Sequence, residues 1–116
     1  MQRRNPRKFV EDALDSASFV IQFAAEGDVE RYRSDRPFRS AIERELIIVG
    51  EALAQLRRLD PQVASHIPDL PQAVDFRNVT VHGYGLLSAE IVWSTVQDDL
   101  PNLVTQLQNV LADLES

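Results

Sequence analysis

The sequence predicts an all-α fold, an antiparallel bundle of four main helices with a short connecting helix. Apolar residues recur three and four positions apart along most of the chain, and prolines or glycines fall between these runs. The only dense β-branched stretch, Val79-Thr80-Val81, is three residues long. With 116 residues, 44% of them hydrophobic, residues 1–116 are expected to form a single domain.

The first helix is expected to begin at Pro6, because Asn5 is a good N-cap and proline suits the first turn. Gly27 is expected to end it. The residues predicted to face the core are Val10, Ala13, Leu14, Ala17, Ile21 and Ala24.

A second proline start at Pro37 leads into a helix that closes at Asp60-Pro61. Gly50, in the middle of this helix, costs about 1 kcal/mol relative to alanine in an exposed helix. We therefore expect a close neighbour there that needs the space. The predicted core positions are Ile42, Leu46, Val49, Leu53 and Leu56.

After a short connector at 61–68, a third helix is expected to open around residues 69–71 and run to His82, where glycines stop it. Ser88 is predicted to cap a fourth helix that runs to the chain end with a kink at Pro101. Its apolar stripe comprises Val92, Val96, Leu100, Leu103, Leu107, Val110 and Leu114.

The composition excludes several classes of protein. Cysteine is absent, so the fold contains neither disulfides nor a Cys-based zinc site. Glu11, Asp12 and Asp15 lie where a signal peptide needs an apolar segment, and no stretch approaches membrane-spanning length. We expect a cytoplasmic protein with no membrane contact.

The formal net charge of -6 is unevenly distributed. All twelve basic residues lie at or before Arg77, whereas residues 85–116 contain five acidic residues and no Lys or Arg. One group of arginines forms either a basic surface or solvated helix ends, and the sequence leaves both open. Its members are Arg31, Arg33, Arg36, Arg39 and Arg44.

The segment with the clearest chemical potential is 77–84. Arg77 and His82 are five positions apart, about 140° around a helix, so they share a broad side of it. Histidine can move a proton near neutral pH, and arginine can grip phosphate oxygens with two N–H groups. These groups suit RNA cleavage without a metal, with the 2'-hydroxyl as nucleophile. A two-fold dimer would bring two such pairs into one cleft.

No metal site or cofactor is predicted. The two histidines, His66 and His82, are sixteen positions apart and form no two-histidine motif. Phosphate-binding glycine loops and a Gly-x-Ser-x-Gly elbow are absent. Spacing alone also allows a purely structural interpretation, in which Arg77 forms a surface ion pair and His82 sits favourably at a helix C-terminus.

The Arg-x4-His-x-Tyr element of Arg77, His82 and Tyr84 resembles the signature of the HepT-like toxins, minimal members of the HEPN superfamily of prokaryotic ribonucleases. Other segments resemble the family in the expected order along nearly the whole chain. Residues 69–71 and 75–76 depart from the family pattern and leave the motif intact. The matching segments are 41–52 ending in Gly-Glu-Ala, Ile67-Pro68, Ile91-Val92-Trp93 and Leu100-Pro101-x-Leu103.

The resemblance implies a homodimeric, metal-independent RNA endonuclease toxin. Arg77 and His82 of both copies would form the site at the dimer cleft, with His82 assisting proton transfer and Arg77 stabilising the phosphate charge. Asn78 would orient one of them. In similar toxins the residue at the Tyr84 position receives AMP from a cognate MNT-type nucleotidyltransferase antitoxin. Tyr84 lies between two glycines, so an accessible turn is expected.

The dimer seam is expected on the first and fourth helices, which carry apolar residues beyond one stripe: Phe19, Phe23, Trp93 and Leu111. Two other interpretations remain open. The chain could be a non-catalytic docking partner of a nucleotidyltransferase, which would keep Tyr84 but tolerate loss of His82. It could also be a purely structural dimer joined through the second and fourth helices.

Overall fold

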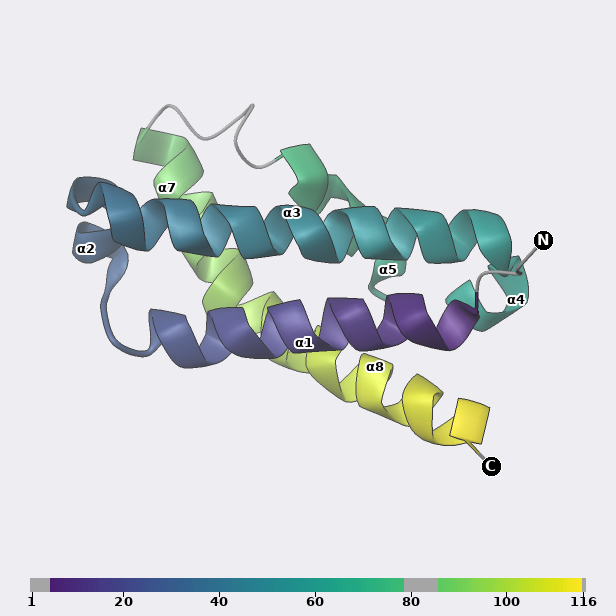
Figure 1. The fold of residues 1–116 in the computed structure, drawn as a ribbon. Coiled ribbons are helices and arrows are strands. Elements are labelled where there is room, and N and C mark those ends of the chain that lie inside the picture. The colour runs from purple at the N-terminus through teal and green to yellow at the C-terminus, as the bar shows by residue number, and fades with distance from the viewer. Residues whose placement is uncertain (1–4, 79–85, 116) are drawn as a thin grey trace.

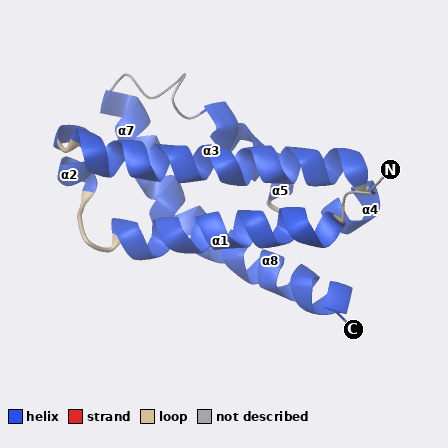
Figure 2. Cartoon of the chain, viewed as in Figure 1, coloured by secondary structure: helices blue, strands red, loops and turns tan. Residues whose placement is uncertain are grey.

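The computed structural model describes residues 5–78 and 86–115, and every regular element in these two ranges is helical (Figures 1 and 2). The all-α prediction is confirmed. The elements in chain order are α1 (Pro6–Ala24), α2 (Val29–Ser34), α3 (Arg36–Leu59), α4 (Pro61–Ala64), α5 (Leu70–Val74), the 3-10 turn η1 (Asp75–Asn78), α7 (Leu86–Ser94), the π-helical segment η2 (Thr95–Asp99) and α8 (Leu100–Glu115).

The long helices α1 and α3 run side by side, and the α7–η2–α8 run crosses behind them (Figure 1). The predicted stripe on α3 is buried, because Ile42, Leu46, Val49, Leu53 and Leu56 are at most 1% exposed. The facing residues of α1 and α8 are also buried. They are Val10, Ala13, Ala17, Val20 and Ala24 on α1 and Leu100, Leu103, Leu107 and Val110 on α8.

Aspartate and asparagine side chains start the first three helices. The Asn5 side chain accepts from the Arg7 backbone N–H at 2.9 Å, as predicted, and Asp28 begins the additional helix α2, which the sequence reasoning missed. Asp35 caps α3, which begins at Arg36, one residue before the expected start at Pro37. The Phe38 backbone N–H, and secondly the Arg31 guanidinium, hold the pKa of Asp35 below its usual value.

The prediction that the third helix is one continuous α-helix is wrong. The α-helix ends at Val74 and continues as the 3-10 turn η1 to Asn78, and the expected stop beyond it lies outside the described residues. The physical reason is a close contact with α3. The backbone of residues 73–77 lies against Gly50, and the tighter 3-10 turn follows the short α5 there.

The fourth helix also differs from the prediction. Ser88 lies within α7 instead of capping it, since the helix begins at Leu86. Before Pro101 the helix widens into η2, where the Leu100 N–H donates to the Thr95 carbonyl. Proline has no N–H to donate and crowds the preceding turn, and this widened turn accommodates it without ending the helix.

An aromatic cluster contains two residues of the expected dimer seam, and the seam itself stays a prediction. The Phe23 and Trp93 rings lie 5.1 Å and 6.3 Å from the Phe38 ring, and Leu111 packs against the core. These apolar residues are therefore used within one copy of the chain. Of the four seam residues, only Phe19 has a largely exposed side chain, at 44%.

No helix in the described ranges is both long and apolar enough to cross a membrane.

We expect Leu53→Ala to lower the free energy of unfolding by about 2–5 kcal/mol, because Leu53 is fully buried and its truncation leaves a cavity. Leu59→Ala is the matched control on the same helix. Its side chain is 42% exposed, so the loss should be about 0.5 kcal/mol or less. Urea unfolding followed by circular dichroism measures both, and equal losses would contradict the assigned core.

Candidate active site

The position of η1 depends on a glycine in α3. A Cβ atom at Gly50 would lie 2.6 Å from the backbone nitrogen of Arg77 and 2.9 Å from the Val74 carbonyl oxygen. Both contacts involve backbone atoms, which cannot rotate away. The expectation that Gly50 makes room for a close neighbour is confirmed, and the neighbour is the segment that carries Arg77.

The structure describes two of the four predicted site residues, Arg77 and Asn78. Arg77 and Asn78 are exposed at the end of η1, and Arg77 forms no ion pair within the described ranges. His82 and Tyr84 lie outside the described residues. Their proximity to Arg77 and their roles therefore stay predictions.

The chain before the motif is fixed to α8 by a pair of reciprocal hydrogen bonds. The Asp69 backbone N–H donates to Gln106 Oε1 at 3.0 Å, and Gln106 Nε2 donates to the Asp69 carboxylate at 2.8 Å. Asp69 belongs to the stretch that departs from the family pattern. The aspartate that departs from the family pattern therefore forms the contact between the start of α5 and α8.

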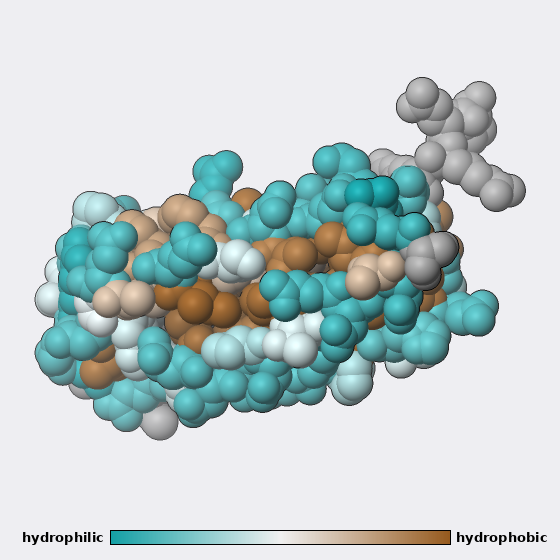
Figure 3. Space-filling view, turned by 90° about the horizontal axis from the view of Figure 1, so that it is seen from below, coloured by the Kyte–Doolittle hydropathy of each residue, from teal (hydrophilic) through white to brown (hydrophobic). Residues whose placement is uncertain are grey.

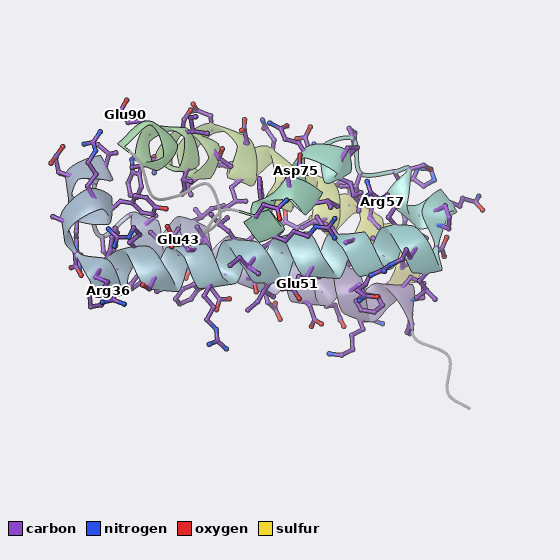
Figure 4. All side chains as sticks on the ribbon, turned by 90° about the horizontal axis from the view of Figure 1, so that it is seen from above. Arg36, Glu43, Glu51, Arg57, Asp75 and Glu90 are labelled. Atoms are coloured by element: carbon purple, nitrogen blue, oxygen red, sulfur yellow. The ribbon has the colours of Figure 1, made fainter. Side chains whose placement is uncertain are left out.

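The chain after the motif is fixed to α2. The Arg33 guanidinium forms ion pairs with Glu30 on its own helix and with Glu90 on α7. The Trp93 ring lies 6.0 Å from the Tyr32 ring, one turn further along α7. The bundle thus sets the positions of η1 and α7, where Figure 4 labels Asp75 and Glu90.

A part-buried polar pair connects α2 and α3. The Tyr32 hydroxyl, on a residue only 1% exposed, donates to Glu43 Oε2 on α3 at 2.8 Å. Burial, and secondly the Glu43 carboxylate, raise the pKa of Tyr32 well above its usual value. The phenol therefore stays protonated and joins α2 to α3. Sequence reasoning missed this pair because the two residues are eleven positions apart in different helices.

Most of the arginine group is occupied in local contacts. Arg31 pairs with Asp35 at 3.1 Å and stacks over the Phe38 ring, and Arg39 donates to the Arg33 carbonyl. Arg36 and Arg44 form no ion pair within the described ranges. For the arginines around α2, the interpretation as helix-end partners is the better one.

The surface of α3 carries an open groove of about 370 Å³. Its lining residues include Ile47 and Ile48, which are half-buried, and both polar and charged side chains. In the described part of the chain, no three or more His, Asp or Glu residues group as metal ligands would. The groove is lined by Ser40, Glu43, Arg44, Ile47, Ile48 and Glu51.

The family model described as Ribonuclease HepT-like matches residues 13–110, which include α3, η1 and the whole motif. The chain belongs to the HepT-like ribonuclease family. It is accordingly an endoribonuclease with an HEPN-like all-α fold, and the family resemblance seen in the sequence is confirmed.

Several curated proteins are similar over nearly their full length. "Putative RNase MJ1380" of Methanocaldococcus jannaschii is 29% identical over 112 residues, which cover 95% of this chain and all of that protein. "Putative RNase MJ0127" of the same organism is 24% identical, covering 99% and 94%. "Probable ribonuclease HepT" of Thermococcus cleftensis is 25% identical, covering 87% and 91%. No solved structure matches the chain significantly.

We expect Gly50→Ala to impair this HepT-like ribonuclease without unfolding it. The added methyl must push η1 and Arg77 away from α3. Displacement of a reacting group by about 1 Å can cost on the order of a hundredfold in rate. Single-turnover RNA cleavage, corrected for folded protein by circular dichroism, measures the loss.

Gly27→Ala is the matched control for that prediction. Its methyl group would meet only side-chain atoms, Arg31 Cδ at 2.9 Å and Phe38 Cζ at 2.8 Å, far from η1. It should change stability while cleavage per folded molecule stays within about twofold. Equal cleavage by Gly50→Ala and the unmutated protein would contradict the positioning role of Gly50.

Proposed function

We propose that this chain is the toxin of a toxin–antitoxin system, acting in the cytoplasm as a metal-independent RNA endonuclease. Residues 1–116 would act as one domain, and two copies would form the active cleft. The observation that supports the proposal best is the exposed Arg77 at the start of the family motif: it forms no ion pair with the described residues, and its backbone nitrogen lies against Gly50.

The proposed reaction uses the substrate's own nucleophile. His82 takes the proton from the 2'-hydroxyl, and that oxygen attacks the adjacent phosphorus while the bond to the 5'-oxygen breaks. The products are a 2',3'-cyclic phosphate and a 5'-hydroxyl, which receives a proton. Arg77 stabilises the extra charge on the pentacovalent phosphate, and Asn78 orients one of the two groups.

The proposed regulation acts on Tyr84. An MNT-type nucleotidyltransferase antitoxin would transfer AMP from ATP: the Tyr84 oxygen attacks the α-phosphorus, pyrophosphate leaves and the phenolic proton is lost. The adduct adds a bulky anion beside the cleft. It would repel RNA by charge and block it by volume.

We expect His82→Ala to reduce RNA cleavage by about two to four orders of magnitude, the usual contribution of general acid–base catalysis. Arg77→Ala should be similarly damaging. Arg77→Lys should restore only part of the rate, because an ammonium group cannot hold phosphate oxygens bidentately. Gel assays on a defined RNA measure these rates.

Excess EDTA is the control for the reaction class and should leave cleavage intact. If chelation abolishes activity and magnesium restores it, the proposed chemistry is wrong. If His82→Ala cleaves at the normal rate, His82 does not move the proton and the proposed mechanism is wrong.

We expect co-expression with the cognate nucleotidyltransferase to add one or more AMP units to Tyr84 and to silence cleavage. Tyr84→Phe should escape modification and remain active, because Arg77 and His82 are unchanged. Intact-mass spectrometry measures the adduct. An unmodified Tyr84 in a silenced complex would mean that docking alone inhibits the enzyme.

A further inference from the structure

Several exposed arginines form no ion pair within the described ranges. Arg44 shares the groove on α3 with Glu43 and Glu51, so two carboxylates line the same surface. Arg57 and Arg58 differ from it, because they lie in the last turn of α3, where residues 52–59 contain no acidic side chain. The full set is Arg36, Arg44, Arg57, Arg58 and Arg77.

Arg57 lies on the same flank of α3 as the family motif. It follows Gly50 by seven positions, which is nearly two turns, so the two residues differ by only about 20° around the helix axis. The η1 turn lies on that flank, because the Arg77 nitrogen lies against Gly50. Figure 4 labels Arg57 and Asp75 on the same side of α3. The Arg57 backbone is therefore about 10 Å along α3 from the start of the motif.

The end of α3 leaves the Arg57 guanidinium available to an external anion. A cation in the last turn of a helix interacts favourably with the helix dipole, which accounts for a basic residue there but gives its side chain no partner. Two nearby carboxylates already accept hydrogen bonds. Asp60 accepts from the Val63 N–H at 3.1 Å, and Asp69 accepts from Gln106 at 2.8 Å.

We propose that Arg57 binds a phosphate group of the RNA substrate, to one side of the phosphate that is cleaved at Arg77. Phosphates in one strand of a duplex follow one another about every 3.4 Å, so about 10 Å corresponds to about three nucleotides. The net charge is -6 and Asp75 is exposed on η1, so the overall field does not attract RNA and single contacts decide its affinity. This inference rests on the proposed function, because it takes Arg77 as the group that holds the scissile phosphate.

The other surfaces around the motif offer no such contact among the described residues. On the α7 side, the exposed Glu30 and Glu90 carboxylates hold Arg33, so a strand extending there meets negative charge. On the opposite side of the molecule, Figure 3 shows an apolar band over α1 and α8. The cations of α1, Arg7 and Lys8, are in ion pairs. The strand is therefore expected to run from η1 toward the C-terminal end of α3.

Replacement of Arg57 by alanine tests the contact. On a single-stranded RNA of about ten nucleotides, we expect Arg57→Ala to raise KM by on the order of fivefold or more. The value of kcat should stay within about twofold, because Arg57 does not touch the reacting atoms. Arg57→Lys should recover part of the loss, since an ammonium group still attracts phosphate as a point charge. An unchanged KM for Arg57→Ala would overturn the proposal.

The length of the substrate separates binding from structural damage. A dinucleotide contains only the scissile phosphate, so Arg57→Ala should cleave it at the normal rate. A comparable loss on the dinucleotide would mean that Arg57 supports the fold or the reacting groups, and the proposal would be wrong. Arg57→Ala should also reduce the slope of log affinity against log salt concentration by about 0.7 for the longer RNA.

Arg36→Ala is the matched control on the same helix. It removes the same charge from an exposed arginine, but Arg36 begins α3 and lies about 21 Å along the helix from Gly50. Its KM should change by less than about twofold, since charges this far apart are largely screened at physiological salt. Equal increases in KM for Arg36→Ala and Arg57→Ala would indicate a general charge effect and refute the assigned contact. Circular dichroism checks that both variants fold.

A binding measurement separates this inference from the proposed function. The same RNA with a 2'-deoxy sugar at the cleavage position lacks the nucleophile, and fluorescence anisotropy reports its affinity for each variant. Binding that depends on Arg57 by a protein that never cleaves the unmodified RNA would refute the proposed chemistry alone. Cleavage that depends on His82, with equal affinity for Arg57→Ala and the unmutated protein, would refute the Arg57 contact alone.

Discussion

The close approach of η1 to α3 at Gly50 governs the placement of the motif. Glycine is unfavourable within a helix, and here it permits the Arg77 nitrogen and the Val74 carbonyl to lie where a side chain would stand. That contact ends the α-helical run of α5 and turns the chain as a 3-10 segment. It also keeps the backbone of Arg77 against α3. The position of the first residue of the motif therefore depends on one backbone contact.

The sequence predicted the long helices well, because their signals are local. The proline starts, the Asn5 cap and the apolar spacing on α3 act within a few residues of one another. The glycine at position 50 also predicted a close neighbour of α3, and the structure confirms it. The short helix α2 and the 3-10 turn were missed because tertiary contacts stabilise them: Tyr32 bonds to Glu43 across two helices, and η1 rests on α3.

For the candidate site, residue types gave better predictions than the helix geometry assumed for residues 77–82. Arg77 is exposed at the end of η1, which agrees with a role toward RNA. The assumption of one continuous helix from Arg77 to His82 was less sound, since the α-helix ends at Val74. Phe23 and Trp93 belong to an aromatic cluster around Phe38, a contact that periodicity cannot reveal, while the dimer seam expected at these residues stays a prediction.

The ion pair between Arg33 and Glu90 has a consequence for measurements of RNA affinity. Glu90 has 65% of its side chain exposed, so dissolved salt screens its attraction to Arg33 and loosens the attachment of α7 to α2. Salt also weakens contacts between protein and phosphate, and the slope of affinity against salt is commonly converted into a number of phosphate contacts. Where RNA binding requires α7 to be attached to α2, that slope includes a contribution from the fold, and the number obtained then exceeds the true count.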